Sequence, residues 1–82
     1  MSIFIGVTPQ EVAKMEAAIR RHHIKENGIA IAKNIKAEIR VARIGDDGVY
    51  YASAIVKGYA FAPSVASSYV FTKSNGEFTV EW

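Results

Sequence analysis

The sequence predicts an α+β fold in which one N-terminal helix packs on a four- to five-stranded antiparallel sheet, in the order β-α-β-β-β-β. Three observations predict it: a helix-start signal at Thr8-Pro9, strict alternation of apolar and polar residues after Ile35, and an Asn75-Gly76 pair between two strand-like segments. A chain of 82 residues has room for one small domain, so we assign residues 1–82 to a single α+β domain.

The first elements are a short strand and the helix that follows it. Residues 2–7 are apolar and end at the helix-start signal, where Thr8 can cap a backbone N–H, Pro9 suits the first helical position and Glu11 can complete a capping box. We predict a helix from Pro9 to Glu26, ended by Gly28. Apolar residues three and four positions apart make its buried stripe: Val12, Met15, Ala18 and Ile19.

Residues 29–44 fit either a helix or a strand. The helical alternative rests on isoleucines spaced along one helical face and on many good helix formers. The strand rests on the alternation from Ile35 to Val41, which has the period of a half-exposed strand. We favour the strand and leave the helix open.

The third strand follows the turn-forming residues Gly45-Asp46-Asp47-Gly48 and covers residues 49–57. A two-residue loop at Asp46-Asp47 and one at Asp47-Gly48 both place the same residues of the two strands on the same face of the sheet. This pairing places Ile39 and Val41 on one face with three residues of the third strand, Ala52, Ala54 and Val56. The outward face then carries Lys36, Arg40, Tyr51, Ser53 and Ile55.

The last two strands, residues 66–73 and 77–82, form a hairpin around Asn75-Gly76, the preferred pair for a type I′ turn. This register sets Phe71 opposite Val80 and Tyr69 opposite Trp82 on one face. We expect residues 58–64, which contain Pro63, to form a loop before the hairpin.

One helix is too narrow to cover such a sheet. Five strands about 4.8 Å apart span roughly 19 Å, whereas a helix with its side chains is about 10 to 12 Å wide. The opposite face would present apolar side chains to solvent or to a partner, and contiguous apolar patches usually mark contact sites. We predict a partner-binding surface composed of Ile44, Val49, Tyr51, Ile55 and Val70.

Motifs for catalysis, metal binding or phosphate binding are absent from the sequence. His22 and His23 point about 100° apart on a helix, and neither a cysteine nor a third histidine completes a metal site. We expect His22 to border the core, where it can titrate near neutral pH. The sequence therefore predicts no catalytic residue, no metal and no cofactor, and a protein that is not an enzyme.

A nucleic-acid partner is the alternative, because positive charge is concentrated in one half of the chain. Residues 1–45 hold eight Lys or Arg and four Glu (8 − 4 = +4), while residues 46–82 hold two Lys and four acids (2 − 4 = −2). A basic surface of this kind can follow a phosphate backbone. The residues assigned to this alternative are Lys14, Arg21, Lys25, Lys36 and Arg40.

Cysteine usage and hydropathy predict the compartment. The chain has no cysteine, which is typical of a reducing environment. The apolar N-terminal segment is too short for a signal peptide, and no window approaches the roughly 20 apolar residues of a membrane span. We therefore expect a soluble, cytoplasmic protein.

The order of one strand, a helix laid on a sheet and four further strands resembles the arrangement of cystatins and related inhibitors. Their Gln-x-Val-x-Gly motif is absent, since Gln10-Glu11-Val12-Ala13-Lys14 ends in lysine and lies on the helix. The resemblance therefore implies a fold and carries over no residue or activity. We expect a small binding protein that acts as an inhibitor, adaptor or subunit, in a hetero-complex or as a homodimer. A phage or mobile-element protein that blocks a larger machine has this size and lack of motifs.

Overall fold

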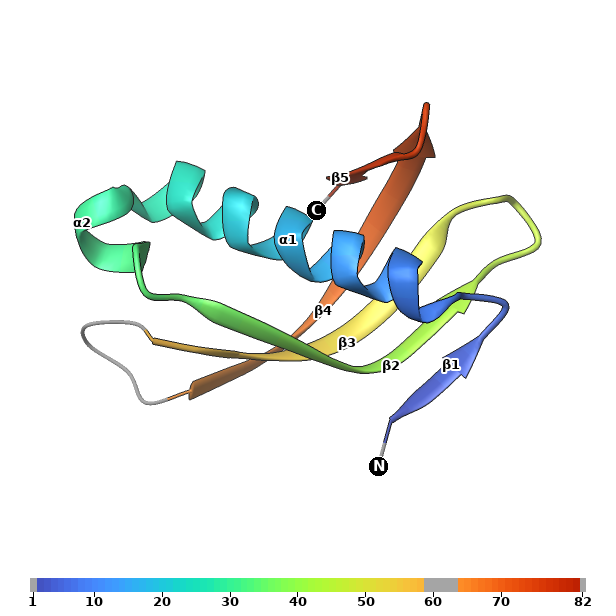
Figure 1. Ribbon diagram of the computed structural model, residues 1–82, viewed down its shortest axis with the longest axis horizontal. Helices are drawn as coiled ribbons and strands as arrows, with labels where there is room; N and C mark the ends of the chain where they lie inside the picture. Colours follow the sequence, from blue (N-terminus) through green and yellow to red (C-terminus); the bar gives the residue numbers. More distant parts are fainter. Residues whose placement is uncertain (1, 59–63, 82) are drawn as a thin grey trace.

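The computed structural model describes residues 2–58 and 64–81 of the chain. It contains one long helix and a five-stranded sheet, which confirms the predicted α+β class (Figure 1). The elements in chain order are β1 (Ile3–Ile5), α1 (Pro9–Asn27), α2 (Ile29–Ala32), β2 (Lys36–Ile44), β3 (Tyr50–Lys57), β4 (Ser64–Ser74) and β5 (Glu77–Val80).

The strands lie in the sheet in chain order, β1-β2-β3-β4-β5. The pairs β2–β3, β3–β4 and β4–β5 are antiparallel, as predicted, but β1 pairs with β2 in parallel. The physical reason is the connection: α1 carries the chain back along the sheet before β2 begins, and such a crossover joins parallel neighbours. The sheet is therefore mostly, and not wholly, antiparallel.

The start of α1 agrees with its sequence signal. The Thr8 hydroxyl accepts a bond of 3.1 Å from the Glu11 N–H, and the Glu11 carboxylate accepts one of 3.0 Å from the Thr8 N–H, which completes the capping box. Gly28, with φ of 85°, ends the helix one residue later than predicted and donates its N–H to the Ile24 carbonyl. The predicted stripe of Val12, Met15, Ala18 and Ile19 is buried, and His23 extends it.

Residues 29–44 adopt both of the structures that their pattern allowed. The first four form the short helix α2, which buries only Ala32, and the strand β2 then begins at Lys36. The division follows burial: Ile29 is 69% exposed, while Ile35 and Ile39 are almost fully buried under α1. The favoured strand is correct for the second part of the segment.

A β-bulge changes the predicted faces of β2. Ile39 pairs with Ala54, yet Val41 pairs with Ser53, so Arg40 is an extra residue in the ladder. Beyond the bulge, Ala42 points to the helix side and is fully buried, whereas Val41 is 39% exposed on the other side. The predicted inward position of Val41 is therefore wrong, since the expected parity assumed a regular ladder.

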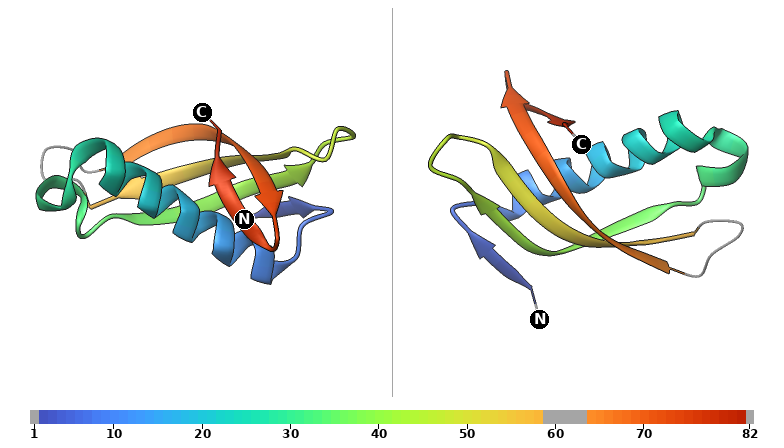
Figure 2. Two further views of the ribbon diagram at one scale, coloured as in Figure 1. Left: turned by 90° about the horizontal axis from the view of Figure 1, so that it is seen from above. Right: turned by 180° about the vertical axis from the view of Figure 1, so that it is seen from behind.

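The core lies between α1 and the concave side of the sheet, which curls around the helix (Figure 2). Ala52 and Ala54 share the buried face, as predicted, and their small side chains permit close approach of the helix. Phe71 pairs with Val80 as expected, and Asn75 and Gly76 both have positive φ, as a type I′ turn requires. The predicted partner of Tyr69, Trp82, and the centre of the predicted loop lie outside the described residues.

Candidate interaction surfaces

The side of the sheet opposite α1 is left uncovered by helices in the described chain (Figure 1). Across residues 2–58 and 64–81 no helix crosses this side, which we call the open face (Figure 1). The strand register arranges its side chains in rows that run across the strands. One row contains Ile5, Arg43, Tyr51 and Val70, and the next contains Ile3, Val41, Ser53 and Ser68.

Tyr51 lies on the open face at the start of the middle strand, β3, and is held from two sides. The Arg43 guanidinium carbon lies 4.3 Å from the centroid of its ring, within the range of a cation–π contact. Its hydroxyl donates a bond of 3.3 Å to the Asp47 carboxylate. The ring also covers Gly45, where a Cβ atom would approach a ring carbon to 2.9 Å. An aromatic ring held in this way changes little in conformation when it contacts a partner.

The open face contains three of the five residues predicted for partner binding. Tyr51, Ile55 and Val70 lie on it and are half-buried by their neighbours. Ile44 does not: the bulge turns it to the helix side, where it pairs with Tyr50 and covers Gly6. Val49 precedes β3 in the turn, and its N–H donates to the Asp47 carboxylate over 3.0 Å.

Sequence reasoning missed three apolar side chains of the open face. Ile3, Ile5 and Val41 are 50%, 60% and 39% exposed, and the two isoleucines extend the rows onto β1. The alternation of Ile3 and Ile5 was visible in the sequence, but only the parallel pairing with β2 shows which side they occupy. Strict alternation placed Val41 on the helix side, and the bulge moves it to the open face.

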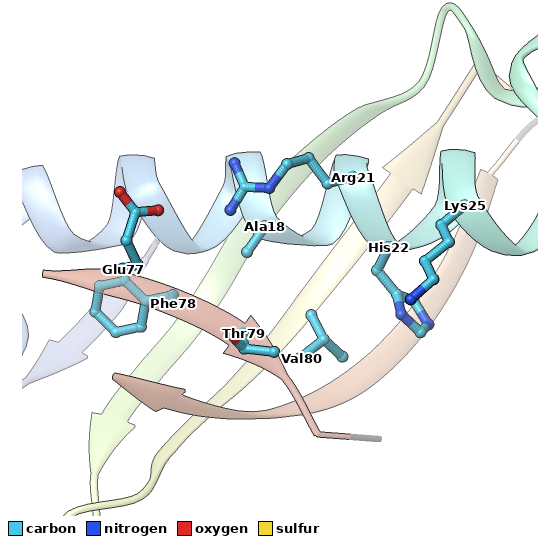
Figure 3. Close-up of a pocket in the computed structure, with 8 residues that line it drawn as sticks. All are labelled: Ala18, Arg21, His22, Lys25, Glu77, Phe78, Thr79 and Val80. Carbon is cyan, nitrogen blue, oxygen red and sulfur yellow. The ribbon is translucent and has the colours of Figure 1, made fainter. Parts of the chain in front are cut away.

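The five basic residues of the nucleic-acid alternative lie in two separate groups. Lys14, Arg21 and Lys25 follow the flank of α1 beside β5, where a hollow of about 330 Å³ also contains His22 and Glu77 (Figure 3). Lys36 and Arg40 lie on β2, and Arg40 is 3.5 Å from the Glu38 carboxylate. The structure does not bring the five together into one basic track.

The histidine pair differs from expectation in one respect. His23, rather than His22, is the buried member, and its Nε2 lies 2.6 Å from the hydroxyl of the buried Tyr69. Burial lowers the pKa of His23, the neighbouring His22 lowers it further, and Glu26 opposes the change. His22 is half-buried beside the hollow at β5. The predicted position of His22 at the border of the core agrees with this, whereas the burial of His23 was not predicted.

A charged cluster joins the start of α1 to β3 and β4. The Glu11 carboxylate accepts bonds from the Lys73 ammonium at 2.8 Å and the Tyr50 hydroxyl at 3.1 Å. Together with the bond from the Thr8 N–H, the Lys73 bond lowers the pKa of Glu11 to about 2. The same contact raises the pKa of Lys73. All three partners stabilise the charged carboxylate, so we assign this cluster to fold stability.

No group of three or more His, Cys, Asp or Glu side chains within residues 2–58 and 64–81 could hold a metal ion. In the same part of the chain, neither helix is long and apolar enough to cross a membrane. Comparison with protein-family models, curated proteins and solved structures gives no match. The resemblance to cystatins therefore rests on the order of elements alone.

Proposed function

We propose that this chain is a small non-enzymatic binding protein that contacts another protein through the open face. The observation that supports it is the pair of cross-strand rows, in which exposed isoleucines on β1 continue into Tyr51 and Val70 on β3 and β4. Tyrosine and arginine are enriched among the residues that dominate binding energy at protein interfaces, and the contact between Arg43 and Tyr51 places one of each side by side on the open face.

The composition of the rows matches a moderate-affinity interface. Apolar side chains alternate with Arg43, Ser53 and Ser68, so the open face contains hydrogen-bonding groups as well as apolar area. Burying a few hundred Å² of apolar surface contributes several kcal/mol, at about 25 cal/mol per Å², before the costs of association are subtracted.

The test is a pair of charge-introducing substitutions in the open face, Tyr51→Asp and Ile55→Asp. A protein captured from the host by the wild-type chain is purified, and its affinity for each variant is measured by calorimetry. We expect Tyr51→Asp to weaken binding by about tenfold or more, because a buried carboxylate without a partner opposes association. The matched control is Gln10→Asp with Ala30→Asp, at exposed helical positions. Unchanged affinity in both sheet variants rules out the open face.

A homodimer would use the same face in a different way. Sedimentation at several concentrations measures the oligomeric state of the wild type and of Tyr51→Asp. A wild-type dimer that becomes monomeric in the variant identifies a second copy as the occupant, with the open face as a self-complementary interface.

Nucleic-acid binding remains the alternative prediction, and the row of Lys14, Arg21 and Lys25 beside β5 is the part of the structure that favours it. Binding through phosphates weakens steeply with salt. A gel shift at two salt concentrations, with wild type and an Arg21→Gln, Lys25→Gln variant, distinguishes it from docking through the open face.

A further inference from the structure

The flank of α1 opposite β5 borders a second groove, which lies away from the open face. It has a volume of about 780 Å³, against 210–380 Å³ for the other hollows that we compared in the described chain. Its lining residues come from α1, the α2–β2 connection and the first half of β2: Ala13, Glu16, Ala17, Arg20, Lys33, Asn34, Ile35, Lys36 and Ala37. We call it the edge groove.

The edge groove follows a sheet edge that has no strand beside it in the described residues. β1 pairs only with Val41, Ala42 and Arg43, so it covers the second half of β2 and leaves the first half as an edge (Figure 1). An uncovered strand presents a row of backbone N–H and C=O groups that another extended chain can pair with.

Side chains of α1 already bind two backbone groups along this edge. The Glu16 carboxylate accepts the Ile39 N–H over 2.9 Å, and the Arg20 Nε donates to the Ile35 carbonyl over 2.9 Å. In an antiparallel ladder, alternate residues direct both backbone groups to the same side. Ala37 lies midway between Ile35 and Ile39, so its N–H and C=O point into the groove.

The shape of the groove suits an extended chain. A strand added beside β2 lies about 4.8 Å from it and has alternate side chains on opposite sides. The side chains directed towards α1 would meet Ala13 and Ala17, which are small and leave room for them. From Ile35 to Ile39 the edge spans roughly five residues at about 3.3 Å per residue. An added strand pairs with Ala37 in the middle, because the Ile35 carbonyl and the Ile39 N–H are already bound by Arg20 and Glu16.

The lining of the edge groove carries a net positive charge, which favours an acidic partner. Arg20, Lys33 and Lys36 contribute three cations, and the one carboxylate of the lining, Glu16, is engaged with the Ile39 N–H. The bond from Arg20 to Ile35 uses one of the five N–H donors of its guanidinium. The groove therefore combines strand-pairing groups with a net positive rim, which complements carboxylates.

We propose that the edge groove binds an extended acidic peptide segment, which adds to the sheet as a strand beside the first half of β2. Backbone hydrogen bonds to Ala37 supply the pairing, and carboxylates of the peptide contact the cations of the rim. This site is additional to the open face and does not depend on it.

The experiment uses a fluorescein-labelled octapeptide that alternates threonine and glutamate, and a second peptide with glutamine in place of glutamate. Fluorescence anisotropy measures the affinity of the full chain for each peptide. We expect the glutamate peptide to bind at least about fivefold more tightly, and this preference to shrink as salt is raised.

Two variants test charge and pairing separately. In Lys33→Gln, Lys36→Gln, we expect affinity for the glutamate peptide to fall about fivefold or more. The matched control, Arg21→Gln with Lys25→Gln, removes the same charge from the other flank of α1 and should change affinity less than about twofold. Ala37→Pro removes the pairing N–H at an edge position that tolerates proline, and we expect binding to be lost.

Hydrogen exchange keeps the proposal testable if Ala37→Pro does not fold. In the wild type, the glutamate peptide should slow exchange of the Ala37 amide and leave that of Glu38, which faces β3, unchanged. Unslowed exchange at Ala37 overturns the proposal, as does the absence of saturable binding, equal affinity for both peptides, or equal weakening in the control variant. Wild-type self-association that Ala37→Pro abolishes also overturns it, because the occupant would then be a second copy.

Failure here is distinguishable from failure of the proposed function. The groove variants change Lys33, Lys36 and Ala37, whereas docking through the open face is tested at Tyr51 and Ile55. A groove that binds neither peptide leaves the effect of Tyr51→Asp on the protein partner to be measured independently.

Discussion

At the scale of single residues, Glu11 connects more of the fold than any other carboxylate with a described contact. It closes the capping box of α1, accepts a hydrogen bond from the Tyr50 hydroxyl on β3 and forms a salt bridge with Lys73 of β4. These bonds are made to the charged carboxylate, so the folded state holds this group ionised to low pH. Its pKa of about 2 in the fold, against 4.5 for an ordinary glutamate, links stability to acid.

We predict that Glu11 makes the protein lose stability between pH 4.5 and about 2. In this range the unfolded chain binds a proton at Glu11 and the folded chain does not, so acidification favours unfolding; above pH 4.5 the contribution is complete. Glu11→Gln should remove this part of the pH dependence and lower stability at pH 7 by about 1 to 2 kcal/mol. Urea denaturation from pH 7 to pH 2 measures both effects.

The comparison with Glu11→Gln isolates Glu11 from the other titrating groups. His23 has a lowered pKa, so its contribution begins to fall as pH drops below its ordinary value of 6.5, at a higher pH than that of Glu11. If the two proteins lose stability in parallel below pH 4.5, the Glu11 cluster is not the cause.

At the scale of elements, the bulge in β2 decides which side chains reach the core. Val41 and Ala42 exchange the sides that strict alternation predicts, and the same shift moves Ile44 away from the open face. The extra residue of the bulge is Arg40, which lines a shallow hollow together with Ser53 and Ile55 of the open face.

Substitution of the two neighbours at the bulge therefore gives opposite results. Val41→Glu should change stability by less than about 0.5 kcal/mol, because the side chain is exposed. Ala42→Glu should cost more than about 3 kcal/mol and unfold much of the protein, because the carboxylate would enter a fully buried site. Thermal denaturation followed by circular dichroism compares them, and the reverse order would mean a regular ladder.

The end of β3 depends on a glycine that meets the chain before β2. Gly58 has φ of 98°, and a Cβ there would overlap the carbonyl group of Asn34. Gly48 has φ of 80°, but a Cβ at that position would meet no atom within 4 Å. The two glycines share a backbone preference and differ in their surroundings.

Substituting alanine at Gly48 and at Gly58 separates the cost of a positive φ from the cost of a steric clash with the Asn34 backbone. Gly48→Ala should cost about 1 kcal/mol, the price of a left-handed conformation for a residue with a side chain. Gly58→Ala should cost at least about 1 kcal/mol more, because β2 and β3 must move apart where they begin and end. Urea midpoints of the two variants measure the difference, and equal midpoints would contradict the close approach.

At the scale of the whole molecule, local sequence patterns predicted the helices and strands, whereas the pairing of distant strands determined which side chains lie on the open face. The capping box, the Asn75-Gly76 turn and the alternation that begins at Ile35 are features of a few neighbouring residues, so the sequence displays them directly. The bulge at Arg40 and the parallel pairing of β1 arise between distant segments. The sequence therefore predicted Tyr51, Ile55 and Val70 on the open face and missed Ile3, Ile5 and Val41.

The molecule as a whole is one-sided. One helix packs on the concave side of the sheet, and the open face on the other side carries apolar rows with charged and hydroxyl side chains among them (Figure 2). The edge groove lies between the flank of the helix and the first half of β2. Of the residues that line the edge groove, Lys36 alone also borders the open face, so each surface can be altered while the other is kept.

The arrangement of the strands has a consequence for the order in which the protein assembles. From β2 to β5 every strand pairs with its successor, so this meander can assemble from neighbouring hairpins, each of which forms within about 1 to 10 μs. β1 must instead find a strand 38 positions away, Ile3 opposite Val41, and it brings only three residues to that encounter. We therefore expect β1 to dock late and to detach first under load, ahead of any loss of the meander.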